Sequence, residues 1–120
     1  MNFASGSQLA QARPSGTSAV SAYTATLRTE INLIVIANTT GSSANFSIYH
    51  DDDGSTFDAS TALYEANALA ANTSLRLVFE PGSGIMVNRG GQIGIKSGTG
   101  NALTFTIYGT TASLTGKGNG

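Results

Sequence analysis

The segment richest in chemically active side chains is His50-Asp51-Asp52-Asp53-Gly54, which holds three of the seven acidic residues and the only histidine. An acidic run after a strand can bind a cation, hold a substrate or form a turn. Asp-Gly is a strong turn pair, and neighbouring aspartates can accept hydrogen bonds from the backbone amides of a turn. We therefore predict that this run is a turn that ends a strand.

A calcium site is the first alternative for these aspartates. The Asp51-x-Asp53-Gly54 pattern is similar to the start of an EF-hand loop, but Gly54 stands at loop position 4 instead of 6, and position 12 is Ala62. The pattern therefore fails as an EF-hand. A calcium site of another kind, formed by Asp51, Asp53 and Asp58, stays open as the less favoured alternative to a turn.

Catalytic constellations are missing from the rest of the chain. A serine hydrolase needs a histidine to accept the proton of its nucleophile, and His50 is predicted to continue the inward face of Phe46 and Ile48 as a packing residue. Carboxylate pairs for glycoside hydrolysis would have to come from aspartates crowded in one turn, or from Glu65 or Glu80. We expect a protein that is not an enzyme and that binds no cofactor.

Composition limits the partners that we expect. The six Lys and Arg residues are spread along the chain, so no basic cluster is available to bind nucleic acid. Cysteine is absent, which excludes disulfides, thiolate catalysis and Cys-ligated zinc. No segment approaches the roughly 20 apolar residues of a membrane span, and the first residues do not have the pattern of a secretory signal.

Length and charge indicate one domain that contacts other protein. The chain has 120 residues, of which 40% are hydrophobic and 11% are charged. One domain with one core fits this length. Typical soluble domains have about 25% charged residues, so the deficit indicates a surface that is covered in an assembly. The plainer alternative is an all-β domain whose many turns require Ser, Thr and Gly.

Apolar residues that alternate with polar ones predict half-buried strands, because successive side chains of a strand point to opposite faces. The segment 31–36 is apolar on both faces, which predicts a central strand or one whose outer face meets another chain. Weaker or shorter candidates are 20–27, 85–87 and 92–95, and 60–71 is predicted as a strand although its Ala, Leu and Glu content also suits a helix. The clear alternations are Ala44, Phe46 and Ile48; Leu75, Leu77 and Phe79; and Leu103, Phe105 and Ile107.

Turn residues recur at short intervals between these segments, which predicts an all-β fold, an antiparallel β-sandwich or jelly roll. The segment 1–18 is small and polar and shows no periodicity, so we expect an extended N-terminal arm. The β-sandwich domain is predicted to span 19–109. The segment 110–120 is predicted to be a flexible C-terminal tail.

Four segments resemble a group of small bacteriophage virion proteins, and the resemblance extends from about Leu9 to Gly109. They are Leu9-Ala10-Gln11-Ala12-Arg13-Pro14-Ser15, Ile36-Ala37-Asn38-Thr39-Thr40-Gly41, Ile48-Tyr49-His50-Asp51-Asp52-Asp53-Gly54 and Ala102-Leu103-Thr104-Phe105-Thr106-Ile107-Tyr108-Gly109. The resemblance implies a β-sandwich without catalytic residues that acts as a capsid decoration or cement subunit, or as part of the neck or tail.

A decoration role implies a virion protein made in the cytoplasm of a bacterial host. Its expected partners are further copies of itself, as a homotrimer, and the major capsid protein or another virion protein. We expect the arm to supply the contacts, through Leu9, Gln11, Arg13 and Pro14, together with the solvent-side residues of 31–36.

The alternative is a tail or neck component that displays a receptor-binding or carbohydrate-binding surface. Exposed aromatic residues would stack on sugar rings in that case, and the absence of Trp counts against it. The candidates are Tyr23, Tyr49, Phe57, Tyr64 and Tyr108.

Overall fold

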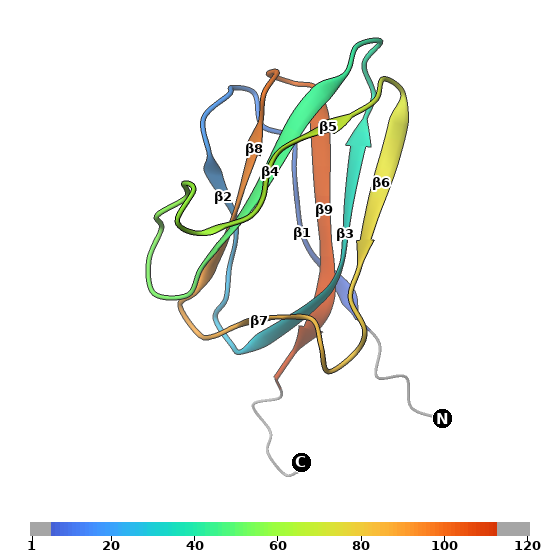
Figure 1. Ribbon diagram of the computed structural model, residues 1–120. Coiled ribbons are helices and arrows are strands. Elements are labelled where there is room, and N and C mark those ends of the chain that lie inside the picture. Colours follow the sequence, from blue (N-terminus) through green and yellow to red (C-terminus); the bar gives the residue numbers. More distant parts are fainter. Residues whose placement is uncertain (1–5, 113–120) are drawn as a thin grey trace, which may run out of the picture.

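The computed structural model describes residues 6–112, which fold into nine strands (Figure 1). Within this range, no helix is long and apolar enough to cross a membrane. The strands are β1 (Ser7–Ala12), β2 (Val20–Thr24), β3 (Thr29–Asn38), β4 (Ala44–Asp51), β5 (Ala62–Leu69), β6 (Thr73–Val78), β7 (Ile85–Val87), β8 (Gln92–Ser97) and β9 (Leu103–Thr111).

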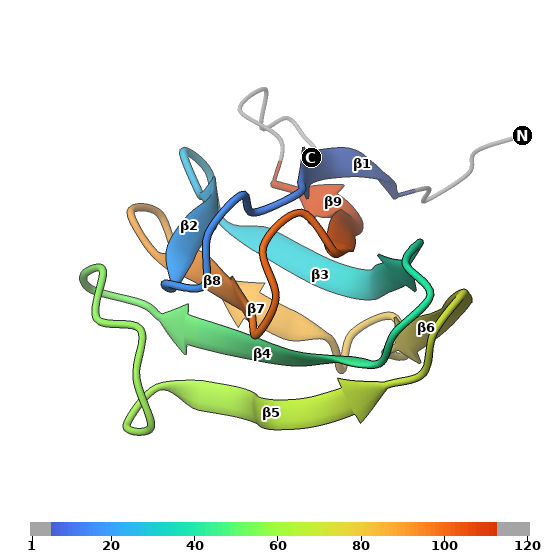
Figure 2. The same ribbon diagram turned by 90° about the horizontal axis from the view of Figure 1, so that it is seen from above.

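The strands form two antiparallel sheets that pack face to face (Figure 2). One sheet has the order β1-β9-β3-β6, with the short β7 also paired to β3, and the other has the order β2-β8-β4-β5. Apart from the short β7, the strands pair from the two ends of the chain inward: β1 with β9, β2 with β8, β3 with β6, and β4 with β5 in the central hairpin. A long hairpin rolled onto itself gives this order, which is that of a jelly roll. The predicted all-β, antiparallel sandwich is confirmed.

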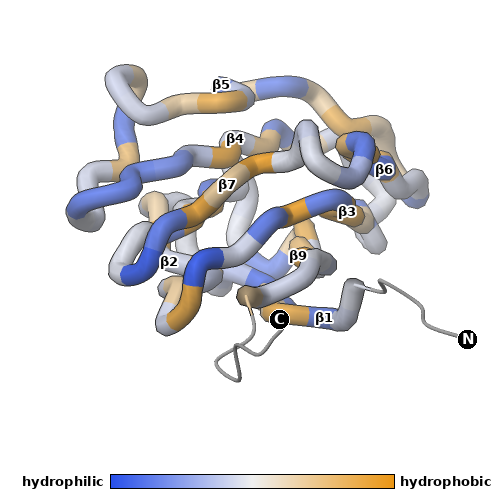
Figure 3. Tube along the Cα trace, turned by 90° about the horizontal axis from the view of Figure 1, so that it is seen from below, coloured by the Kyte–Doolittle hydropathy of each residue, from blue (hydrophilic) through white to orange (hydrophobic). Residues whose placement is uncertain are grey.

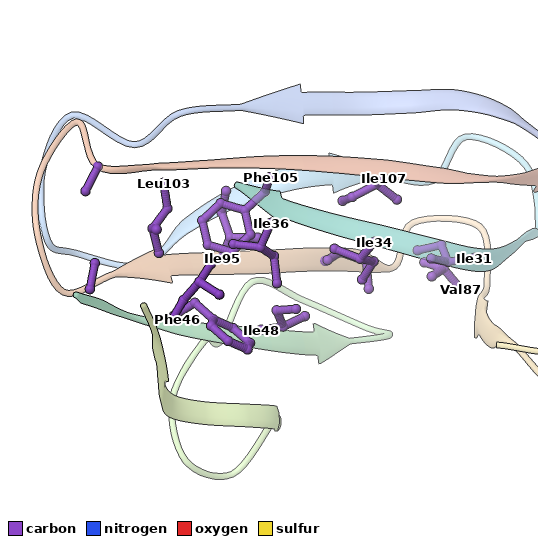
Figure 4. Close-up of a cluster of buried hydrophobic side chains, with 14 of the residues drawn as sticks. Ile31, Ile34, Ile36, Phe46, Ile48, Val87, Ile95, Leu103, Phe105 and Ile107 are labelled. Atoms are coloured by element: carbon purple, nitrogen blue, oxygen red, sulfur yellow. The ribbon is translucent and has the colours of Figure 1, made fainter. Parts of the chain in front are cut away.

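The core lies between the two sheets and consists of side chains from their inner faces (Figure 4). The predicted alternations are confirmed: Phe46 and Ile48 on β4, and Leu103, Phe105 and Ile107 on β9, are fully buried. The half-buried Leu75 and Leu77 of β6 pack against the same core. Hydrophobic and hydrophilic residues alternate in the first part of β3 in Figure 3, and 33–36 are all apolar. Each fully buried aliphatic or aromatic side chain stabilises the fold by about 1.5–3 kcal/mol relative to an exposed one.

A bulge in β3 changes the alternation of its apolar residues. The register with β9 shifts between Ile31 and Leu33, so both Ile31 and Ile34 point into the core although three positions separate them. Gly109 is opposite the bulge, where a Cβ would lie 2.2 Å from the carbonyl oxygen of Glu30. The close approach of the two backbones therefore requires glycine at this position.

The weaker strand predictions are also confirmed. The segment 20–27 contains β2, and 60–71 contains β5 instead of a helix. In β5, Ala66 has a φ of 52°, a left-handed conformation that interrupts the pairing with β4. Its backbone N–H donates to the Oγ of Ser47 over 2.9 Å, so the irregular residue keeps a hydrogen-bond partner.

The structure corrects the expectation of an arm over 1–18. Residues Ser7–Ala12 form β1, which pairs with β9 inside the domain. Its register shifts between Gln8 and Ala10, and Leu9, Ala10 and Ala12 pack against the core. The bulge breaks the alternation, and alanines bury little area, so the sequence period is hidden. Met1–Ser5 lie outside the described residues.

The end of the domain also differs from the predicted boundary at 109. Thr110 and Thr111 continue β9 and pair with Glu30 and Thr29. The N–H of Ala112 donates to the carbonyl oxygen of Arg28 over 2.8 Å. The described fold therefore includes the first residues of the predicted tail, and 113–120 lie outside the described residues.

Candidate functional site

The first aspartate of the acidic run ends β4 and organises the turn after it. The Oδ1 of Asp51 accepts the N–H of Asp53 over 3.2 Å, and its Oδ2 accepts the N–H of Thr56 over 2.7 Å. The side chain is buried, with 8% of its residue surface exposed. The amides of Thr56 and then Asp53 hold the pKa of Asp51 below its usual value, because both hydrogen bonds favour the ionised form.

The second aspartate joins this turn to another part of the chain. The Oδ1 of Asp52 accepts the backbone N–H of Asn88 over 2.8 Å and lies 3.0 Å from the Nε2 of His50. The side-chain amide of Asn88 donates to Oδ2 of the same carboxylate. The backbone amide of Asn88 is the largest cause of the lowered pKa of Asp52. His50 is half-buried and supports the turn through Asp52.

Asp53 and Asp58, the other two candidate calcium ligands, interact with different residues. Asp53 is exposed, and the neighbouring carboxylate of Asp51 raises its pKa. Asp58 accepts the N–H of Ser60 over 2.8 Å and its hydroxyl over 2.5 Å, which lowers the pKa of Asp58. Within residues 6–112, no three acidic or histidine side chains are grouped so that they could hold a metal ion. The turn is therefore organised by amides, and the structure does not bring Asp51, Asp53 and Asp58 together as ligands.

The loop after the turn covers part of the outer face of the β2-β8-β4-β5 sheet. Phe57 packs directly on Gly94, where a Cβ would lie 2.5 Å from the phenyl ring. The ring of Tyr49 on β4 lies 6.2 Å from that of Phe57, and Tyr49 is fully buried although it points away from the core. The loop therefore covers this sheet around Gly94 and Tyr49.

The outer face of the other sheet has no such cover among the described residues, and we call it the open face. Cross-strand pairs arrange it in rows, and two of them cross all four strands β1, β9, β3 and β6. One runs Gln8, Tyr108, Leu33, Val78, and the other runs Gln11, Thr106, Val35, Arg76. Its members are Gln8, Gln11, Leu33, Val35, Ala37, Ser74, Arg76, Val78, Thr104, Thr106 and Tyr108. Arg76 is the only charged residue among them, and Val78 is the most exposed large hydrophobic residue described, at 64%.

The residues predicted to contact a partner make contacts inside the domain. Leu9 packs against the core, and Pro14 is buried. The guanidinium of Arg13 donates to the carbonyl oxygen of Asn101 through Nε over 3.1 Å and Nη2 over 2.5 Å. Gln11 is exposed and donates to the Oγ1 of Thr106 over 3.0 Å. Only Gln11 of these four belongs to the open face.

The aromatic residues considered for sugar stacking are not gathered on one surface. Tyr23 is hydrogen-bonded to Thr29, Tyr49 and Phe57 pack on each other, and Tyr64 packs near Phe46. Tyr108 belongs to the open face. The described part of the chain contains no pocket in which a small ligand could be enclosed.

Sequence reasoning found part of the open face and missed the rest. The solvent-side residues of 31–36 were expected to contact a partner, and the structure identifies them as Leu33 and Val35. Tyr108 and Arg76 come next to them only through the pairing of strands far apart in sequence. The contact between Asp52 and Asn88 joins residues 36 positions apart and has no local signal.

Comparison with known proteins adds a weak likeness to a solved structure. No family model and no curated protein matches the sequence. Among solved structures, the chain is similar to one described as the structure of infectious bursal disease virus Gx strain, with 12% sequence identity and a TM-score of 0.45. The alignment covers 90% of this chain and 37% of that one, so the chain spans little more than a third of its length.

Proposed function

We propose that the protein is a non-enzymatic structural protein of a bacteriophage virion, a capsid decoration or cement protein. In this proposal, copies assemble as homotrimers on the head and bridge subunits of the major capsid protein. The observation that carries the proposal is the contrast between the two sheets. The 52–61 loop packs on the outer face of one sheet at Gly94, and the other sheet presents the partly apolar open face, on which Arg76 is the only charge.

The open face has the size of the centre of a protein interface. On β3 its residues run from Leu33 to Ala37, about 17 Å, and four strands are about 19 Å wide, which gives roughly 320 Å². A standard protein interface buries about 800 Å² on each partner, so the open face would supply the central part of one. The core of such an interface is depleted of charge, and Arg76 is the only charge on the open face. This charge-poor surface suits contact with another protein.

Bridging would stabilise a capsid by mass action. A protein that binds the assembled lattice and not the free subunits shifts the equilibrium toward the assembled state. The fold and the acidic turn support this role. The jelly roll is used by viral capsid and lectin domains among others, so it is only an analogy at the level of the fold. The carboxylates of Asp51, Asp52 and Asp58 accept hydrogen bonds from backbone amides, which supports a structural role for these side chains.

The resemblance of four sequence segments to phage virion proteins supports the bacteriophage part of the proposal. A tail or neck component is the alternative within the same virion. The copy number in purified particles separates them, because decoration proteins follow the repeats of the capsid lattice and tail parts are few.

The open face is tested by placing charge on it. The double variant Gln8→Glu, Gln11→Glu adds two carboxylates at exposed positions, and it is incubated with capsids purified without the protein. The control variant Asn45→Asp, Ser21→Asp adds the same charge to exposed positions of the other sheet. We expect the open-face variant to bind at least about tenfold more weakly than wild type, because unpaired charges must be desolvated. Unchanged binding by this variant, or equal losses in both variants, would contradict the proposal.

A further inference from the structure

The outer edge of β6 is a row of backbone groups that point away from the domain. The N–H of Phe79 donates to the carbonyl oxygen of Asn32 over 2.8 Å, and this pair continues the register of β3 and β6. In an antiparallel ladder, the backbones of alternate residues point toward the same neighbouring strand. The backbone groups of Thr73, Leu75 and Leu77 therefore bond to β3. The backbone groups of the alternate residues point away from β3.

The residues in question are Ser74, Arg76 and Val78, and all three are exposed. Over residues 6–112, neither the other backbone groups nor any side chain forms a hydrogen bond with their N–H and C=O groups. The other edge strands β1, β2 and β5 are irregular, because register shifts interrupt their pairings. In β6, by contrast, all six residues pair in one register. A regular, open edge is a template for another strand.

We propose that β6 is a self-association edge, at which the β6 strands of two copies pair antiparallel about a twofold axis. The unpaired N–H and C=O groups of one β6 edge can bond to those of a second β6 edge. In an isologous contact both copies use the same edge, so the backbone groups of both are paired at once. The pairing would join the two open-face sheets into one continuous sheet.

Arg76 selects the register of this pairing. A register centred on Arg76 would place two guanidinium groups directly opposite, which is destabilising. A register centred on Leu77 places each Arg76 opposite Val78 of the second copy and forms about four backbone hydrogen bonds. The aliphatic stem of Arg76 then covers Val78, which is 64% exposed in the single chain. The outer-face position beyond Val78 is Glu80, whose charge complements that of Arg76.

This inference goes beyond the virion role, because it concerns the purified protein alone. A twofold contact at β6 gives dimers in solution, and it is separate from the contacts that would close a trimer on a capsid. Failure of one proposal therefore leaves the other intact.

Sedimentation of the purified full chain tests the edge. We expect wild type to pass from monomer to dimer between about 1 μM and about 500 μM. Arg76→Pro removes only an N–H that points away from β3, a change that edge strands accept, and it should raise the dimer dissociation constant at least about tenfold. The control Arg76→Thr keeps the N–H and should still dimerise. A wild type that stays monomeric or forms only trimers, or an Arg76→Pro protein that dimerises like wild type, overturns the proposal.

Hydrogen exchange of the wild-type protein provides a second readout that needs no variant to fold. The amides of Arg76 and Val78 should exchange more slowly at high protein concentration than at low concentration, because the second copy protects them. The amide of Leu75 already bonds to β3 and serves as the internal reference. Equal exchange rates of Arg76 and Val78 at both concentrations overturn the proposal.

Discussion

Asp51 and Asp52 stabilise the same turn from two sides. Asp51 holds the turn itself through the amides of Asp53 and Thr56, and Asp52 ties it to Asn88 after β7. A turn could be predicted here because Asp-Gly and clustered aspartates are local signals. Asn88 could not be predicted as a partner, because only the folded chain brings it to Asp52. The two aspartates therefore act as structural acceptors.

These hydrogen bonds make the turn sensitive to acid. Folding lowers the pKa values of Asp51 and Asp52 from a usual value of 3.8. Their stabilisation is therefore complete above the unfolded pKa and is lost as the pH falls through the folded pKa. We expect the melting temperature to fall steadily below about pH 4 and to be nearly constant between pH 5 and 7, as measured by circular dichroism.

Two variants separate the loss of these carboxylate hydrogen bonds from general acid denaturation. Asp52→Ala should lower the melting temperature at pH 7 by several degrees and weaken its dependence on pH. Asp53→Asn should leave the melting temperature at pH 7 unchanged or slightly higher, because Asp51 raises the pKa of Asp53. An Asp52→Ala protein as stable as wild type at pH 7 would show that the carboxylate does not hold the turn.

Strands with a strong period could be predicted, and β1 could not. The buried alternations of β4 and β9 gave clear signals, whereas β1 was mistaken for an arm because a bulge at Leu9 breaks its pattern. The pairing of β1 with β9 and of β2 with β8 follows from the closing of the jelly roll, and no local property of the sequence indicates it. The open face depends on these pairings, so as partner contacts only its β3 residues and Gln11 were predicted from the sequence.

The strand character of β1 is tested by Leu9→Ala. Leu9 packs against the core, and removing a partly buried leucine side chain should lower the free energy of unfolding by about 1–3 kcal/mol in urea denaturation. The control Gln8→Ala changes an exposed side chain and should stay within about 0.5 kcal/mol of wild type. A free arm would instead make both variants as stable as wild type.

The whole molecule is a jelly roll whose two sheets have different outer faces. The 52–61 loop covers part of one of them, and the other combines a surface with a single charge, Arg76, and the open edge of β6. In the proposed virion role, the open face meets the capsid. The pairing of two copies at the β6 edge is a separate proposal for the purified protein. The small share of charged residues, 11% of the chain, fits a surface of which much is covered by other protein.

Cryo-electron microscopy of the virus particle that contains the protein tests this role most directly. The proposal predicts this jelly roll at repeating positions on the outside of the head, with β1, β9, β3 and β6 turned toward the capsid shell. Density confined to the tail or neck, or an open face turned toward solvent at every position, would contradict it.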